Sequence, residues 1–165
     1  MFLTFNKKKT QKLRKTFIIS SILFLLFCGK SFKLQGQNTS DLLDRSSWLK
    51  RTGQREASFE FIEKAEKIAK NPTEKAKSII AKASWFNYYG FRDTAHTLHK
   101  QVLNFAIEQN LNDLLPELYQ LNGRANFRID KELAIEYCKK AKELSNDELY
   151  KANCEACIQH ALAIF

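Results

Sequence analysis

The side chains best suited to chemistry stand close together near the C-terminus, in the segment CEACIQH. It places Cys154, Cys157 and His160 at intervals of three residues, so a helix would carry all three near one face. Thiolates and imidazoles bind zinc, and a Cys-x-x-Cys pair can also carry out redox reactions. The segment therefore raises the hypothesis of a metal or thiol protein.

The setting of this segment favours packing over chemistry. A structural zinc site needs four ligands, and the sequence offers no second pair beyond His96 and His99 in HTLH. A redox Cys-x-x-Cys usually opens a helix, whereas the helix here should begin near Asp147, about two turns before Cys154. We expect the two cysteines to be small packing residues, and both HTLH histidines to lie on a solvated helix face.

No other catalytic signature is present in the sequence. Nothing resembles a phosphate-binding loop, a nucleophile elbow or a zinc-protease helix. The sequence therefore favours a protein that is not an enzyme, and it predicts no catalytic residue, metal or cofactor.

The elements that would position these side chains are helices. Gly53, Pro72, Gly90 and Pro116 separate stretches of about 15 residues in which apolar side chains follow helical spacing. Strand-like alternation is almost missing. The sequence predicts an all-α fold of antiparallel helices joined by short connections.

Three of the expected helices share one pattern. SFEFIEKAEKI, AHTLHKQVLNF and AIEYCKKAKEL begin at Ser58, Ala95 and Ala134, which are 37 and 39 residues apart. A small residue opens each segment, and seven residues later stand Ala65, Val102 and Ala141. Each segment follows an expected first helix that carries its own packing stripe. The stripe is Leu42, Ser46 and Leu49 in the first unit, Ile79, Ala83 and Phe86 in the second, and Leu118, Leu121 and Asn122 in the third. The pattern indicates a repeated helix hairpin.

Turn residues fit the same register. Gly53 and Gly90 each stand five residues before the opening small residue, where a tightly bent backbone is easiest for glycine. Ile129 takes this place in the third unit, and Asp130 after it can cap the following helix. In that helix we expect Ala134 and Ala141 to admit the first helix closely. Tyr137 and Leu144 should then pack onto the next unit.

Hairpins with a large-then-small stripe on the first helix and two small residues on the second resemble the tetratricopeptide repeat. The likeness covers roughly residues 40–165 and is strongest in AIEYCKKAKEL with RANFRID before it. It implies a short right-handed solenoid of about three hairpins, followed by a single C-terminal helix within Asp147–Phe165. The alternative is a non-repeating helical bundle with alanine-rich packing.

The resemblance also implies a binding face. In this family the inner groove is lined by first-helix residues and binds a protein or peptide. Carried over by position, the groove residues are Ile80, Ser84, Asn87, Tyr88, Tyr119, Gly123, Asn126 and Phe127. A row of amides can hold a peptide backbone, so we expect a neutral, partly apolar groove. The alternative is that Tyr88 and Phe127 pack between units.

The N-terminal residues 1–37 have the order of a secretory signal. A basic stretch precedes the apolar run Phe17–Gly29, which is short for a stable membrane span. We therefore expect residues 38–165 to be exported, to the periplasm, the outer membrane or the medium, as in similar Bacteroidetes-type tetratricopeptide-repeat proteins. The alternative is an inner-membrane anchor through residues 17–29. Lipidation of Cys28 is also open, although Phe27 before it is large for that processing.

Charge is concentrated in the same leader. The chain has 165 residues and a net charge of +9, of which the leader holds eight basic residues and no acid. The remainder is almost neutral, which argues against a nucleic-acid partner. The expected function is an interaction scaffold outside the cytoplasm. The alternatives are the sensor portion of a signalling protein that lacks its kinase or DNA-binding output domain, and the metal or thiol protein considered above.

Overall fold

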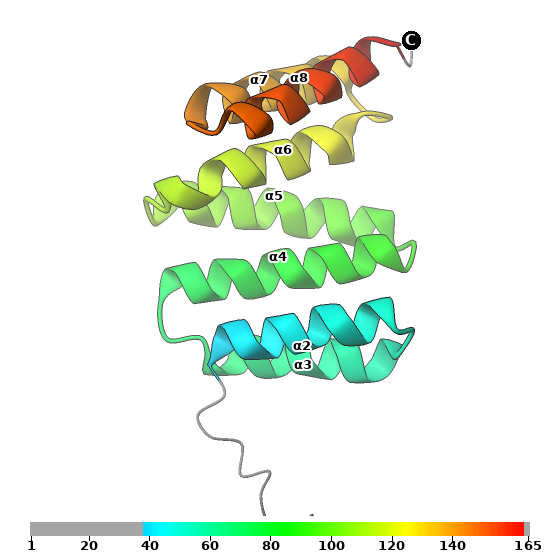
Figure 1. Cartoon of the computed structure of the whole chain (residues 1–165), viewed down its shortest axis with the longest axis vertical. Coiled ribbons are helices and arrows are strands. Elements are labelled where there is room, and N and C mark those ends of the chain that lie inside the picture. Colours follow the sequence, from blue (N-terminus) through cyan, green and yellow to red (C-terminus); the bar gives the residue numbers. More distant parts are fainter. Residues whose placement is uncertain (1–37, 164–165) are drawn as a thin grey trace, which may run out of the picture. The chain divides into compact units, whose positions relative to one another are not determined.

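The computed structural model describes residues 38–163, and these are all-α, as expected (Figure 1). The expected export signal and any role of Cys28 lie outside them. No strand occurs in this range, and none of its helices is long and apolar enough to cross a bilayer. The elements are α2 (Thr39–Arg51), α3 (Arg55–Ile68), α4 (Pro72–Tyr88), α5 (Arg92–Glu108), the 3-10 turn η1 (Asn112–Leu114), α6 (Leu115–Asn126), α7 (Lys131–Leu144) and α8 (Glu148–Ala163).

Polar caps fix where several helices begin. The side chains of Asn38, Asn71 and Asp130 accept hydrogen bonds from backbone amides three residues ahead, at 2.8, 2.8 and 2.9 Å. Each bond satisfies an amide that has no partner within the helix, which typically contributes about 1 kcal/mol. The expected cap at Asp130 is confirmed. Asp147 caps α8 by accepting from Leu149 N at 2.8 Å and from Tyr150 N at 3.2 Å.

Glycine makes two of the tight connections. Gly53 joins α2 to α3 with φ +78°, and Gly90 joins α4 to α5 with φ +87°. These left-handed conformations are costly for residues with a Cβ, so the expectation at both positions is confirmed. The α6–α7 connection lacks a glycine and instead ends at the Asp130 cap.

Each helix packs against the next along the chain, and α2 also contacts α4 while α6 contacts α8. Small buried side chains mark the crossings. At the α2–α3 crossing, Ser46 Oγ lies 3.2 Å from Ser58 Oγ. Ala134 and Ala141 of α7 are fully buried, as expected. Leu144 is less buried, because half of its surface is exposed.

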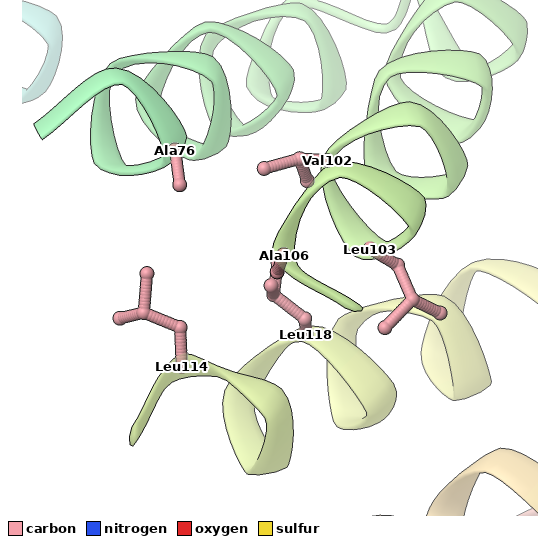
Figure 2. Packing of buried hydrophobic residues seen from close by; sticks show 6 residues of the cluster. All are labelled: Ala76, Val102, Leu103, Ala106, Leu114 and Leu118. Atoms are coloured by element: carbon pink, nitrogen blue, oxygen red, sulfur yellow. The ribbon is translucent and has the colours of Figure 1, made fainter. Parts of the chain in front are cut away.

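A buried apolar cluster joins three helices in the middle of the described unit. Ala76 comes from α4 and Val102, Leu103 and Ala106 from α5, while Leu114 and Leu118 come from η1 and α6 (Figure 2). Asn122 adds a buried polar link, because its Nδ2 donates to the carbonyl of His99 on α5 at 3.0 Å. Burying this apolar surface is the main favourable term for the central helices.

Candidate functional site

Two of the expected groove residues meet a lysine where α2 and α4 lie side by side. Lys50 Nζ of α2 donates to Ser84 Oγ of α4 at 2.9 Å and lies 5.4 Å from the centre of the Tyr88 ring. Partial burial, and then the positive Arg51, lower the pKa of Lys50. We call Lys50, Ser84, Asn87 and Tyr88 the α2–α4 seam.

The seam presents polar and aromatic surface together. Asn87 is exposed, and 58% of the surface of Tyr88 is accessible. A lysine ammonium above an aromatic face is attracted by the ring quadrupole. No acidic group of the described residues forms an ion pair with Lys50. The seam therefore combines an ammonium, an amide and a ring within reach of one ligand segment.

Lys50 is the site residue that the sequence-based set omitted. It stands 37 residues before Asn87, and Asn126 stands 39 residues after Asn87, so Lys50 belongs to the same register. Extending the amide row into the first unit would have found it. Its charge also means that this face differs from the neutral groove expected from the sequence.

Ile80 and Tyr119 are partly buried against the central apolar cluster. The Tyr119 ring lies 5.8 Å from Tyr137 of α7, and Lys140 Nζ lies 5.7 Å from the Tyr119 ring centre. Tyr119 therefore interacts with its own hairpin partner rather than facing away from it.

Gly123 faces α7, not an open groove. A Cβ built on Gly123 would lie 2.6 Å from Cys138 Sγ and 3.1 Å from the carbonyl oxygen of Ala134. The missing side chain lets α6 and α7 approach closely. The expectation that Gly123 points away from the hairpin partner is therefore not what the structure shows.

Asn126 and Phe127 are also engaged within the fold. Asn126 is only 3% exposed, and its Nδ2 donates to the carbonyl of Asn122 at 2.8 Å. The Phe127 ring lies 5.4 Å from the imidazole of His160 on α8, in an edge-to-face pair. This contact matches the alternative expectation for Phe127, in which the ring packs between units. Tyr88 is exposed and does not match that alternative.

The aromatic residues around Gly90 are occupied by packing as well. Arg55 at the start of α3 lies over the rings of Trp85, Tyr89 and Phe91, at 5.4, 4.9 and 5.3 Å. The cationic side chain fills the space between these rings and ties the α2–α3 turn to the end of α4. A ligand cation would have to displace Arg55 to use them.

The residues of CEACIQH do not converge on a metal site. Cys154 is fully buried, Cys157 is partly buried and His160 is exposed. Within residues 38–163 no three histidine, cysteine or acidic side chains are grouped so that they could hold a metal ion. Cys154 Sγ accepts a weak hydrogen bond from Gln120 Nε2 of α6 at 3.8 Å, which fits a packing role.

The two histidines of HTLH lie in different environments. His96 is partly exposed, but His99 is 95% buried, and neither of its ring nitrogens has a hydrogen-bond partner among the described residues. The expectation that both lie on a solvated face is therefore wrong for His99. Burial, and then the neighbouring His96, lower the pKa of His99 to about 4.

Comparison of the chain with protein-family models, with curated proteins and with solved structures gives no match.

Proposed function

We propose that residues 38–165 form a short right-handed solenoid of tetratricopeptide-like hairpins that acts as a non-enzymatic interaction scaffold. The register of buried small and polar residues supports this arrangement. Three sets of positions repeat at intervals of 37 and 39 residues, and every member is buried: Ser46, Ala83 and Asn122; Ser58, Ala95 and Ala134; Ala65, Val102 and Ala141. Such periodicity is expected when each unit packs onto the next in the same way.

Helix contacts give a second line of support. Within each hairpin the first and second helices pack together, as α2–α3, α4–α5 and α6–α7. The second helix of one unit then packs on the first helix of the next, and α2 contacts α4 while α6 contacts α8. First helices therefore contact each other at α2–α4 and, if α8 is counted as a fourth first helix, at α6–α8, but α4 and α6 do not.

The binding face of this scaffold is the α2–α4 seam, which is lined by first helices. The observation that carries the proposal is the combination of an exposed Tyr88 ring and Asn87 amide with Lys50, an ammonium held in place by Ser84. Asn87 can donate to and accept from a peptide backbone. Tyr88 offers rigid apolar area at a small entropic cost.

The partner that fits this chemistry is an extended protein or peptide segment. Lys50 can pair with a carboxylate or a carbonyl of the segment, and one ammonium gives only a modest salt dependence. Residues of the third unit contribute less than the resemblance implies, because Gly123 and Asn126 are buried. Contacts should therefore concentrate on the first two hairpins.

The proposed setting of the scaffold is outside the cytoplasm. This proposal rests on the basic and apolar zones of residues 1–37, which lie outside the described residues. Export followed by removal of the leader would leave an almost neutral domain.

Site-specific photo-crosslinking tests the face. A photoreactive phenylalanine analogue is placed at Tyr88, or at Ile107 of α5 as the control, in the full chain expressed in its own host. Both positions are about half exposed, so labelling efficiency is comparable. We expect a discrete protein adduct from position 88 and none from position 107. Equal adducts from both positions, or adducts only from position 107, would overturn the assignment.

A further inference from the structure

We propose that the edge of the domain formed by the three hairpin turns docks on an anionic lipid surface. These turns join α2 to α3, α4 to α5 and α6 to α7, and Figure 1 shows all three at the same side of the helical stack. We call residues 51–56, 89–93 and 124–132 the turn edge. The α2–α4 seam uses the sides of first helices, so the turn edge is a second surface beyond the proposed function.

Arginine is concentrated on the turn edge. Residues 38–163 contain six arginines, and five of them stand here: Arg51, Arg55, Arg92, Arg124 and Arg128. All five are exposed, and none of them forms an ion pair with an acidic side chain of the described residues. A guanidinium group can donate two parallel hydrogen bonds to one phosphate, so such a row is suited to a surface of phosphate groups.

Charge also differs between the two edges of the domain. On the turn edge six basic residues stand against four acidic ones, which leaves a net charge of +2. The opposite edge is formed by residues 38–41, 67–75, 107–117 and 143–149 (Figure 1). There three basic residues stand against eight acidic ones, a net charge of −5. The nearly neutral domain is therefore polarised, and a negative surface attracts it with the turn edge foremost.

The four acidic residues of the turn edge stand at helix starts. Asp130 accepts a hydrogen bond from Leu133 N at 2.9 Å. The other three, Glu56, Asp93 and Glu132, lie in the first turns of α3, α5 and α7. Carboxylates at these positions interact favourably with the positive end of the helix dipole. Their charge is therefore partly compensated within the domain, and the arginines determine the charge that the edge presents.

Two of the turns also expose a large apolar side chain beside an arginine. Phe91 precedes Arg92 and is 45% exposed, and Ile129 follows Arg128 and is 66% exposed. The guanidinium of Arg55 lies 5.3 Å from the centre of the Phe91 ring, so basic and apolar groups are in contact there. Exposed apolar side chains gain free energy when they enter the headgroup layer of a bilayer, where anionic lipids attract basic residues.

This combination favours a lipid surface over a nucleic acid. The phosphates of a nucleic acid would attract the arginines, but they give no reason for an exposed isoleucine between Arg128 and Asp130. The interface of a bilayer takes up apolar side chains and binds basic ones at a similar depth. It is also deformable, so separate turns can each contact it without a groove shaped for one partner.

Tryptophan scanning of the full chain tests the proposal. Phe91→Trp and Ile129→Trp place the probe on the turn edge. Leu149→Trp places it on the opposite edge, at a position that is 74% exposed. Each variant is mixed with vesicles of phosphatidylglycerol and phosphatidylcholine whose brominated acyl chains quench a tryptophan that enters the bilayer.

Two sources of background are the same in every variant. Residues 1–37 are present throughout, so attachment of the basic leader to the vesicles affects all probe positions alike. The native Trp48 and Trp85 contribute an emission that the wild type measures. Circular dichroism without lipid checks that each variant is folded, and the two turn-edge positions are independent tests if one variant folds poorly.

We expect a blue shift and quenching at positions 91 and 129, and neither at position 149. Vesicles of phosphatidylcholine alone should give neither effect at any position. Adding Arg92→Gln and Arg128→Gln to Phe91→Trp should remove most of the quenching. Adding Lys100→Gln and Lys139→Gln instead removes the same charge at exposed sites away from the turns and should leave it unchanged.

Three results would overturn the proposal. The first is an absence of quenching at positions 91 and 129. The second is equal quenching on the two edges, which would show attachment through the leader alone. The third is a spectral shift at position 91 with a DNA duplex and none with vesicles, which would assign the turn edge to a nucleic acid.

Discussion

His99 is the described side chain whose protonation should most affect stability. Its imidazole is buried on α5 without a hydrogen-bond partner for either nitrogen, so a positive charge there would be uncompensated. The backbone carbonyl oxygen of His99 does have a partner, because it accepts a hydrogen bond from Asn122 Nδ2. The residue is therefore fixed in place by its backbone while its side chain must stay neutral.

Stability should fall as the pH drops below neutrality because of His99. The pKa is about 4 in the folded chain and about 6.5 when the residue is exposed, so the unfolded chain binds more protons between these values. The full contribution is present above pH 6.5, and up to roughly 3 kcal/mol is lost by pH 4. Urea unfolding between pH 7.5 and 4.5 measures it. His99→Leu should flatten the profile; equal slopes for the wild type and His99→Leu would contradict this account.

Single residues also explain why the exposed face of the candidate site could not be fully predicted from the sequence. Asn87 and Asn126 occupy equivalent positions, yet one amide is exposed and the other donates to a carbonyl inside the fold. An asparagine suits both environments, because a buried amide costs little once it is hydrogen-bonded. Gly123 presents the same ambiguity, because a glycine in a helix can lie on an open face or at a close contact between helices. The position of Cys138 shows that Gly123 lies at a close contact.

Helices, by contrast, were largely predictable. Small residues at Ser58, Ala95 and Ala134 identified the second helices, and Gly53 and Gly90 identified two turns. These signals are local, since each depends on one backbone conformation or one crossing. Which face of α6 meets α7 was not predictable in this way, because α6 carries small or polar residues on more than one face.

The close α7 packing gives an element-scale prediction. Ala141 is fully buried, so Ala141→Leu would force extra methyl groups into a filled contact and should cost about 1–3 kcal/mol in unfolding free energy. Lys139→Ala changes an exposed residue of the same helix and should stay within about 0.5 kcal/mol. Chemical unfolding of both variants measures the difference. Equal losses would show that Ala141 does not lie at a tight crossing.

At the scale of the whole chain, residues 1–37 and residues 38–165 have separate tasks in the proposed account. The first would deliver the second, and its eight basic residues would then contribute nothing to binding. The order of basic and apolar zones is what the export pathway recognises, independently of the fold that follows.

A reporter fusion tests the delivery step. An enzyme that is active only outside the cytoplasm is fused after Asn38, and a second reporter that is active only inside is fused at the same place. We expect activity from the first fusion alone. Activity confined to the cytoplasmic reporter would place the protein inside the cell.

The affinity of the crosslinked partner for purified variants tests the scaffold account most directly. Calorimetric titration would compare the wild type with Tyr88→Ala on the α2–α4 seam and Ile107→Ala on α5, after thermal unfolding shows that all three are folded. The account predicts a Kd about tenfold higher for Tyr88→Ala, equal to about 1.4 kcal/mol, and a change within about twofold for Ile107→Ala. An unchanged Kd for Tyr88→Ala, or equal losses for both variants, would contradict it.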